Sequence, residues 1–483
     1  MNLTAKIRSV LWLVLTVLGG CAVGPDFHRP AAPDARAFQS EPATPNLADA
    51  DSQRLNQTLD VPAQWWVLFH SQPLNDLIEL ALKANPNIAA AQAALRAAEE
   101  NAYAQQGAYF PSVDANFNPT RQKTAASLSA IPSSGAYTYS LHTAQVSVSY
   151  VPDVFGGNRR AVESLEALAE SQRFQLEATR LTLASNLVSA AIQEAALRAQ
   201  IDATQSIVDD QSKTLDSFRT QFKLGQLAQA DVTAQEAALA QTQSMLPPLQ
   251  KQLAAQRDLI RALTGRLPDT ELAAKFELSS IHLPNELPLT LPSKLVEQRP
   301  DIRSAEAQMH AASAQIGVAV ANRLPNISID GSFGSSADKL SQLFGTGTSF
   351  WGLAGNVTQP IFQGGTLLHR QRAAEAAYDQ AVALYQATVI AAFQNVADSL
   401  HAIQIDTDAW KSAVAAERAS ARSLEISHRL LQLGSINYLA MLSAEQTWQQ
   451  ARINLIQAQV NRLADSVALF QALGGGWWKR ADT

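Results

Sequence analysis

The chain has 483 residues, of which 47% are hydrophobic and only 17% are charged, and its formal net charge is −6. A chain without clustered basic charge lacks the electrostatic surface that nucleic acids need, so we expect no nucleic-acid partner. The sequence also contains no P-loop, no glycine motif for dinucleotides, no nucleophile elbow and no Cys/His cluster with metal-ligand spacing. We therefore expect neither an enzyme nor a metal or organic cofactor.

Residues 1–20 are typical of a secretory signal peptide, because two basic residues precede the short apolar run Val10–Leu18 and two glycines follow it. The run is too short for an ordinary transmembrane helix. Cys21 is the only cysteine of the chain, and Leu18–Cys21 is similar to the lipobox of bacterial lipoproteins. This similarity implies a covalent lipid on Cys21, and Ala22 in place of an aspartate favours the outer membrane. The alternative is an ordinary signal peptide with an incidental cysteine.

Residues 21–73 contain scattered prolines and many polar side chains, which predict an extended arm between the anchor and the body of the protein. The aromatic run Trp65–Phe69 closes this arm. We expect this run to pack the arm against the body rather than to bind a ligand.

The next segment combines a helix and two strands. Apolar residues at helical spacing predict a helix over residues 74–108, interrupted by Pro86. Residues 112–120 then alternate apolar and polar side chains, and residues 137–151 form a second strand-like run after a polar loop. The alternation changes phase within the second run, which predicts a bulge. Both runs are long enough to cross a bilayer as tilted strands.

A long helix follows, because residues 158–224 contain neither proline nor glycine and are rich in strong helix formers. A helix of this length is a rod of about 100 Å. A turn at Gly225 leads to a second helical segment, residues 229–263, which an internal Pro-Pro pair must break or kink. Prolines then interrupt residues 266–294, which we interpret as a linker. Apolar or small residues recur in the long helix at heptad-like spacing, at Leu176, Leu183, Ala190 and Leu197.

The second half of the chain repeats the first. Residues 84–113 align without gaps with residues 298–327, and two prolines and an isoleucine coincide. The order of the elements is the same in both halves, so we infer an internal duplication. Positions near the end of each long helix recur as well: Gly225 and Glu236 correspond to Gly434 and Glu445.

These patterns predict a mainly helical, internally duplicated protein with strands, in which each repeat supplies two strands and two long helical rods. Four strands cannot close a barrel, because about eight is the practical minimum in a membrane. If the strands span a membrane the protein must therefore oligomerise, with eight strands from two copies or twelve from three. The expected divisions are a signal peptide (1–20), an arm (21–73), a first repeat (74–265), a linker (266–294), a second repeat (295–476) and a tail (477–483).

The duplication, the strand–helix junctions at 151–157 and 358–365, the helix openings at 84–88 and 298–302 and the lipobox-like cysteine resemble TolC/OprM-type outer-membrane efflux proteins. The likeness is strongest to the NodT-like lipoprotein branch, which serves RND transporters. It implies a homotrimer with a shared twelve-stranded transmembrane β-barrel, anchored by lipid in the bacterial outer membrane, and a coiled-coil tunnel that extends into the periplasm. It also implies a periplasmic adaptor protein and an inner-membrane RND transporter as partners.

The resemblance also suggests where a gate lies. It places Gly225 and Gly434 in the turns at the periplasmic tip, where the family has its gate. Asp231 matches a position where some members carry an acidic residue at the constriction, and a helix N-cap is the alternative role for it. Asp209 and Asp210 are further candidates for a selectivity ring, with a solvated helix face as the alternative.

The function that we expect is a passive exit duct for small toxic compounds or drugs, driven by the partner pump. One alternative is an outer-membrane duct for ABC-driven type I protein secretion, since a pore sequence does not strictly encode its partner. Another alternative is a periplasmic coiled-coil scaffold lipoprotein that conducts nothing. The two pairs of strands with polar hairpin loops favour a duct over a scaffold.

Overall fold

The computed structural model of the chain describes residues 22–31, 38, 53–56, 58–125, 138–272, 274–289 and 292–480. The predicted signal peptide and Cys21 lie outside the described residues. The chain forms two compact units. Unit 1 comprises Met1–Arg29, Leu95–Gln172 and Ala305–Tyr385, and unit 2 comprises Pro30–Ala94, Arg173–Ser304 and Gln386–Thr483.

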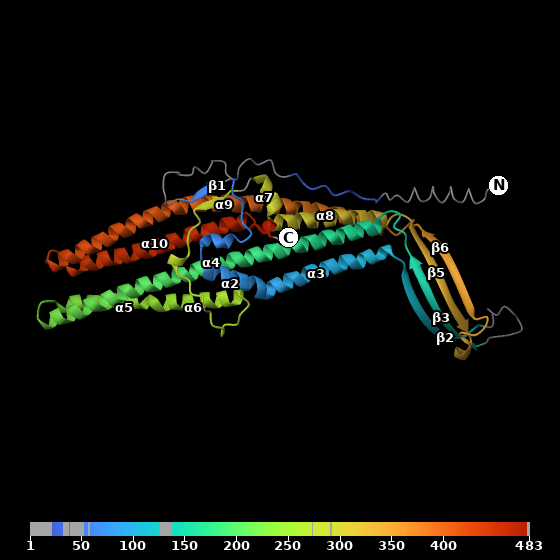
Figure 1. Cartoon of the computed structure of the whole chain (residues 1–483), viewed down its shortest axis with the longest axis horizontal. Coiled ribbons are helices and arrows are strands. Elements are labelled where there is room, and N and C mark those ends of the chain that lie inside the picture. Colours follow the sequence, from blue (N-terminus) through green and yellow to red (C-terminus); the bar gives the residue numbers. More distant parts are fainter. Residues whose placement is uncertain are drawn as a thin grey trace. The chain divides into compact units, whose positions relative to one another are not determined.

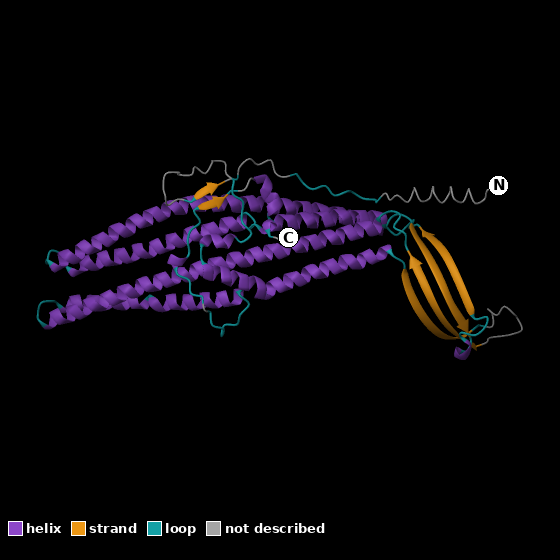
Figure 2. Cartoon of the chain, in the orientation of Figure 1, coloured by secondary structure: helices purple, strands orange, loops and turns teal. Residues whose placement is uncertain are grey.

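Two helices of equal length dominate the chain (Figure 1, Figure 2). Helix α4 spans Gly157–Lys223 and helix α9 spans Thr366–Gln432, each with 67 residues. At 1.5 Å per residue, each helix is about 100 Å long. The long helix predicted from the absence of proline and glycine is confirmed to within one residue at either end. Its counterpart α9 occupies the corresponding place in the second half of the sequence.

Shorter helices complete each half of the chain. A Pro-Pro pair lies in the first turn of the helix that begins at Leu246, where proline is tolerated. The first repeat therefore has two helices, Gln229–Ser244 and Leu246–Leu263, where the second repeat has the single helix Tyr438–Ala472. None of the helices in the described part of the chain combines the length and the hydrophobicity needed to cross a membrane. These shorter helices are α2 (Gln72–Ala84), α3 (Pro86–Gln106), α5 (Gln229–Ser244), α6 (Leu246–Leu263), α7 (Pro292–Gln298), α8 (Pro300–Ala321) and α10 (Tyr438–Ala472).

Four antiparallel strands form one sheet in unit 1, in the order β2-β3-β5-β6 (Figure 1). The central pair joins the two repeats, because β3 belongs to the first and β5 to the second. The strands are β2 (Ser112–Lys123), β3 (Thr138–Tyr150), β5 (Asn326–Ala337) and β6 (Ser349–Thr358).

The prediction of a bulge in the second strand is wrong. Pairing between β2 and β3 runs without interruption from Ser112 opposite Ser149 to Lys123 opposite Thr138. Alternate side chains of a strand point to opposite faces of its sheet. The alternation of apolar residues in the second strand changes phase because Leu141 lies on one face of the sheet and Val146 lies on the other.

The predicted arm and the predicted linker pair with each other in unit 2. Strand β1 (Arg54–Asn56) runs parallel to β4 (Glu286–Pro288). The side-chain amide of Gln53 donates hydrogen bonds of 2.9 Å to the carbonyl of Pro284 and to the hydroxyl of Ser466 in α10. The linker also contains the short 3-10 helix η4 (Leu278–Ser280).

The aromatic run of the arm forms the 3-10 helix η1 (Trp65–Phe69), and its packing role is confirmed. Trp65 and Phe69 are completely buried. The ring of Trp65 stacks on Phe470 of α10, with ring centroids 5.3 Å apart. The segment after α10 is packed as well, in the 3-10 helix η6 (Trp477–Lys479), where the indole N–H of Trp477 donates a hydrogen bond of 2.7 Å to the carbonyl of Gln298.

Candidate functional site

The sheet has one mainly apolar and one mainly polar face, with Leu141 and Phe350 as apolar exceptions on the polar face. Val113, Ala115 and Phe117 of β2 lie opposite Val148, Val146 and Ala144 of β3, and the same face continues through Phe333 and Trp351. These aromatic side chains are exposed, Trp351 by 78%. The opposite face carries Asp114, Asn116, Asn118, Gln145, Ser147, Ser149, Ser328, Asp330, Ser332 and Asn356. Alternation of this kind is typical of strands that cross a bilayer around a water-filled pore.

The polar face of the sheet is acidic. Asp114 and Asp330 are the only charged residues on this face of the described strands. The carboxylate of Asp330 accepts hydrogen bonds from the hydroxyls of Ser149 (2.7 Å) and Ser328 (2.9 Å). It also accepts one from the amide of Asn356 at 3.0 Å. A pore lined by this face would therefore favour cations.

The residues that follow Cys21 lie on unit 1. The backbone N–H of Val23 donates to the carbonyl of Phe155 at 3.1 Å, and Arg160 Nε donates to the carbonyl of Val23 at 3.2 Å. Arg160 Nη2 also lies 2.6 Å from the carboxylate of Asp26. A methyl group on Gly24 would overlap the backbone of Gly317 in α8. We call residues 22–29 the strap.

An aromatic contact holds the strap farther along. The ring of Phe27 stacks on that of His310 in α8, with centroids 4.3 Å apart. His310 Nε2 lies 2.9 Å from the carboxylate of Glu163, which also pairs with Arg160. The strap is therefore bound to both α4 and α8 by backbone, ionic and ring contacts.

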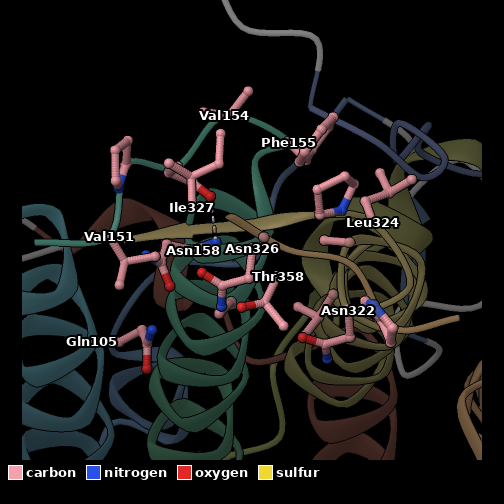
Figure 3. A pocket seen from close by; sticks show the side chains of 18 of the residues that line it. Gln105, Val151, Val154, Phe155, Asn158, Asn322, Leu324, Asn326, Ile327 and Thr358 are labelled. Atoms are coloured by element: carbon pink, nitrogen blue, oxygen red, sulfur yellow. Dashed lines mark hydrogen bonds between the residues drawn. The ribbon is translucent and has the colours of Figure 1, made fainter. Parts of the chain in front are cut away.

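A cavity of ≈ 460 Å³ lies at the start of α4, where strand ends meet helix ends (Figure 3). Its lining includes the amide side chains of Gln105, Asn158, Asn322 and Asn326. Asp153 is the only acidic or basic residue that lines it. Its two carboxylate oxygens accept from the backbone N–H groups of Asn158 and Arg159, both at 2.9 Å, so this side chain caps the N-terminus of α4.

The two turns predicted at the tip have the same geometry. Gly225 and Gly434 have φ values of +71° and +69°, in the left-handed region that favours glycine. In the first turn Gln226 N–H donates to the carbonyl of Gln221, and in the second Ser435 N–H donates to that of Leu430, both at 2.9 Å. These bonds end α4 and α9 in the same way. We call the α4–α5 and α9–α10 pairs the tip hairpins.

The three candidate aspartates near the first turn have different surroundings. Asp231 lies in the first turn of α5, and its alternative role as an N-cap is wrong because Ala228 occupies that position. Asp209 and Asp210 are exposed in α4. Asp209 accepts a hydrogen bond from Gln205 at 2.8 Å, and Asp210 pairs with Lys213 at 3.0 Å.

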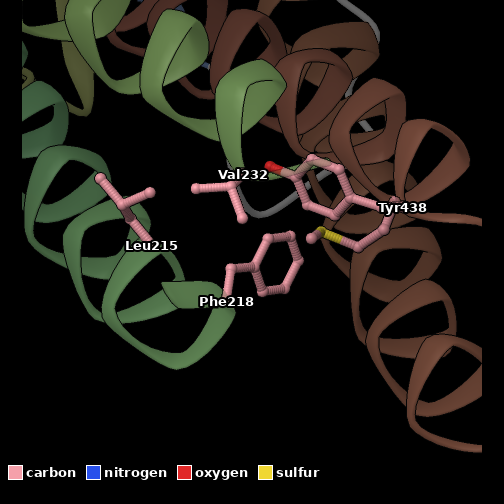
Figure 4. Packing of buried hydrophobic residues seen from close by; sticks show 5 residues of the cluster. Leu215, Phe218, Val232 and Tyr438 are labelled. Atoms are coloured by element: carbon pink, nitrogen blue, oxygen red, sulfur yellow. The ribbon is translucent and has the colours of Figure 1, made fainter. Parts of the chain in front are cut away.

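Two further side chains at the tip were not predicted from the sequence. Tyr438 and Glu445, both in α10, are only 4% and 8% exposed. The ring of Tyr438 packs edge-on against Phe218 of α4, with centroids 4.6 Å apart (Figure 4). Leu215, Val232 and Met441 complete this buried cluster, so it joins both tip hairpins.

Burial changes the titration of both side chains. It raises the pKa of Glu445 to about 7, and the charge of Asp210 acts in the same direction, whereas a hydrogen bond from Gln211 opposes it. Burial likewise raises the pKa of Tyr438, with further contributions from Glu445 and Asp231. The duplication offered one signal for this site, since Glu445 corresponds to Glu236, but it did not indicate which of the two is buried.

Comparisons with known proteins identify related sequences. A family model described as outer membrane efflux protein matches residues 77–266 and 291–475. The toluene efflux pump outer membrane protein TtgC of Pseudomonas putida is 28% identical over 98% of this chain and 96% of its own. The pyoverdine export outer membrane protein OpmQ of the same species is 29% identical over 86% of this chain and 88% of its own.

Solved structures share the fold. The outer-membrane channel OprN superposes with a TM-score of 0.86 at 27% identity, covering 95% of this chain and all of its own. The open state of the MtrE outer membrane channel of Neisseria gonorrhoeae gives a TM-score of 0.81 at 25% identity, covering 95% of this chain and 99% of its own.

Proposed function

The chain belongs to the outer membrane efflux protein family, whose members are channels of the bacterial outer membrane, and on this premise we propose that three copies of it form the passive exit duct of a tripartite RND-type efflux system. The observation that carries this proposal is the two-faced sheet with an unpaired edge at either side. A periplasmic adaptor and an inner-membrane RND transporter would complete the system, with the transporter supplying the energy.

The edges of the sheet require further copies of the chain. Among the described residues, strands β2 and β6 each pair on one side only. An unpaired edge in lipid costs several kcal/mol for each exposed backbone group, so a membrane-spanning sheet has to close. Two four-stranded sheets give eight strands, whose interior is largely filled by side chains, whereas three give twelve and leave a channel. The need for an open channel therefore favours three copies over two.

The strap supports a lipid anchor on Cys21. Its hydrogen bonds to Phe155 and Arg160 hold Ala22 beside Gly156, where a methyl group on Gly156 would overlap Ala22. Gly156 lies between the end of β3 and the start of α4. Acyl chains on Cys21 would therefore begin next to the end of a strand that we propose to cross the membrane.

The substrates that we propose are small toxic compounds or drugs, and the gate that we propose lies at the tip hairpins. The relatives named above serve the efflux of toluene and the export of pyoverdine, which are both small molecules. The glycine turns at Gly225 and Gly434, with Asp231, Asp209 and Asp210, would form the tip that opens and closes.

In-cell crosslinking of tagged protein, followed by mass spectrometry of the captured proteins, tests the proposal. We expect a periplasmic adaptor and an RND transporter to be recovered with three copies of the chain. Recovery of an ABC exporter instead would assign the same duct to protein secretion. A chain captured without transporter and without further copies of itself would contradict the proposal and favour a scaffold.

A further inference from the structure

The contact between the tip hairpins is apolar at one end. Phe218 and Leu215 of α4, Val232 of α5, and Tyr438 and Met441 of α10 bury one another (Figure 4). Burial of large apolar side chains stabilises the contact without regard to pH. The cluster therefore explains why the hairpins stay in contact, but it does not make that contact depend on pH.

The same contact is polar farther along α10. Glu445, Gln211 of α4 and Gln235 of α5 are 8%, 2% and 0% exposed. The amide of Gln235 donates to the backbone carbonyl of Gln211 at 2.8 Å, and the side chain of Gln211 hydrogen-bonds to Glu445. Three buried oxygens here have no hydrogen-bond partner among the described residues: Gln211 Oε1, Gln235 Oε1 and Tyr438 Oη.

The charges that act on Glu445 and on its neighbour Tyr438 are acidic, and one of them, Asp210, is itself paired with Lys213 at 3.0 Å. Asp210 faces it from α4, Asp231 of α5 faces the neighbouring Tyr438, and Glu417 of α9 accepts a hydrogen bond from Trp448, on the next turn of α10. No lysine, arginine or histidine of the described chain forms an ion pair with Glu445. A buried carboxylate without a cation is costly, and protonation removes that cost.

The duplicate of Glu445 has the opposite surroundings. Glu236 is 44% exposed and pairs with Arg219 at 2.8 Å. Counting back from the two glycine turns, the position that corresponds to Arg219 is His428, which is exposed. The second hairpin thus keeps the glutamate but lacks the arginine that would stabilise its charge.

We propose, as a consequence of the proposed function, that Glu445 is a proton-operated latch between the tip hairpins. When protonated, its carboxyl stays packed beside Gln211 and the hairpins stay together, so the tip is closed. When ionised, its charge lies buried beside Asp210, and the α9–α10 hairpin separates from α4 to return the carboxylate to water. Glu445 acts here as a positioning residue for the gate and does not need to contact what passes through.

The direction of the pH dependence follows from linkage. The closed contact raises the pKa of Glu445 to about 7, whereas a carboxyl returned to water has its ordinary value of 4.5. The closed arrangement therefore binds the proton more tightly and is favoured in acid. The preference for the closed arrangement is lost as the pH rises from 4.5 to about 7. Over this range the ratio of closed to open tips changes by a factor on the order of 100.

Single-channel recording in planar bilayers tests the latch. We expect the open probability of the wild-type channel to rise by ~10- to 100-fold between pH 5 and pH 8.5. Glu445→Gln keeps the packing of a protonated carboxyl, so its open probability should stay low at every pH. Glu236→Gln changes the duplicate residue and should follow the wild-type curve. A pH-independent wild-type channel, or a Glu445→Gln curve identical to that of the wild type, would overturn the latch.

A distance measurement separates failure of the latch from failure of the duct. Spin labels on Leu224→Cys and Leu433→Cys, both exposed at the turns, report on the separation of the hairpins, with single-label samples giving the background from Cys21. We expect longer distances at pH 8.5 than at pH 5.5 in the wild type and short ones at both in Glu445→Gln. Distances that do not change with pH in the wild type would overturn the latch. A protein that conducts no ions at any pH, yet shows the pH-dependent distances, would contradict the duct alone.

Discussion

The guanidinium of Arg160, at the start of α4, lies 2.6 Å from the carboxylate of Asp26, a residue shortly after Cys21. Arg160 is nearly buried, whereas Asp26 remains exposed. A hydrogen bond from Arg160, reinforced by its charge, lowers the pKa of Asp26. The contact ties the strap to unit 1 and thereby fixes where the chain leaves its proposed lipid anchor.

Arg160→Ala should release the strap without unfolding the protein. Arg160 provides two of the contacts of the strap, to Val23 and Asp26. Its loss should therefore allow Phe27 to move away from His310. We expect cleavage by chymotrypsin after Phe27 to become several-fold faster, because proteolysis follows the population of the open form. Arg159→Ala is the matched control, since Asp153 is the only ion-pair partner of Arg159 in the described part of the chain. Equal cleavage rates in the two variants would show that Arg160 does not hold the strap.

Gly434→Ala should destabilise the second tip turn. The residue has a φ of +69°, and a methyl group there would meet no neighbouring atom, so the cost is one of backbone conformation alone. An alanine in this region costs about 1–2 kcal/mol. Hydrogen exchange of the last turn of α9 should accelerate accordingly. Gly107→Ala is the control, because Gly107 has open space without a left-handed backbone, and it should leave exchange in α9 unchanged.

Asp114→Asn should reduce the preference of the channel for cations. Asp114 lies on the polar face of the sheet with Asp330, and that face has no basic residue in the described strands. The reversal potential in a salt gradient measures the preference, and the effect should be largest at low ionic strength, where charges are least screened. Asp269→Asn removes an exposed charge outside the sheet and should leave the reversal potential unchanged. A shift of the reversal potential in Asp269→Asn but not in Asp114→Asn would show that the polar face lies away from the ion path.

Asp465→Asn should make the protein more stable at alkaline pH. Burial, together with the charge of the neighbouring carboxyl of Asp406 and a hydrogen bond to it, raises the pKa of Asp465 to about 7. The native state therefore binds this proton more tightly than the unfolded chain, and its stability falls as the pH rises from 3.8 to about 7. Asparagine removes this loss.

Thermal unfolding in detergent measures the effect. The Tm difference between Asp465→Asn and the wild type should be larger at pH 8 than at pH 5. Asp408→Asn, which alters an exposed carboxylate near Lys411, should show no such pH dependence. A constant Tm difference across this range would mean that Asp465 is already ionised in the native protein at pH 5.

Local patterns were enough to predict the long elements of this fold. Helix α4 follows from a stretch without proline or glycine, and the duplication extends that prediction to α9. The alternation of Val113, Ala115 and Phe117 predicted strand β2, because one face of a strand repeats every second residue. These features depend on neighbours in the sequence, so the sequence contains their signal.

The features that local patterns missed depend on contacts between distant residues. Strand β1 has three residues and exists through its pairing with β4. The docking of the strap depends on Arg160 and Gly317, far along the chain. Glu236 and Glu445 have equivalent places in the two repeats, and only the packing of the hairpins decides which one is buried.

The number of chains per particle tests the central claim most directly. Native mass spectrometry of the protein extracted from membranes should give three copies, because three four-stranded sheets close a barrel that leaves a channel. A particle of one copy would leave both sheet edges unpaired, and a particle of two would close a barrel filled by its own side chains. Either result would contradict the proposed duct.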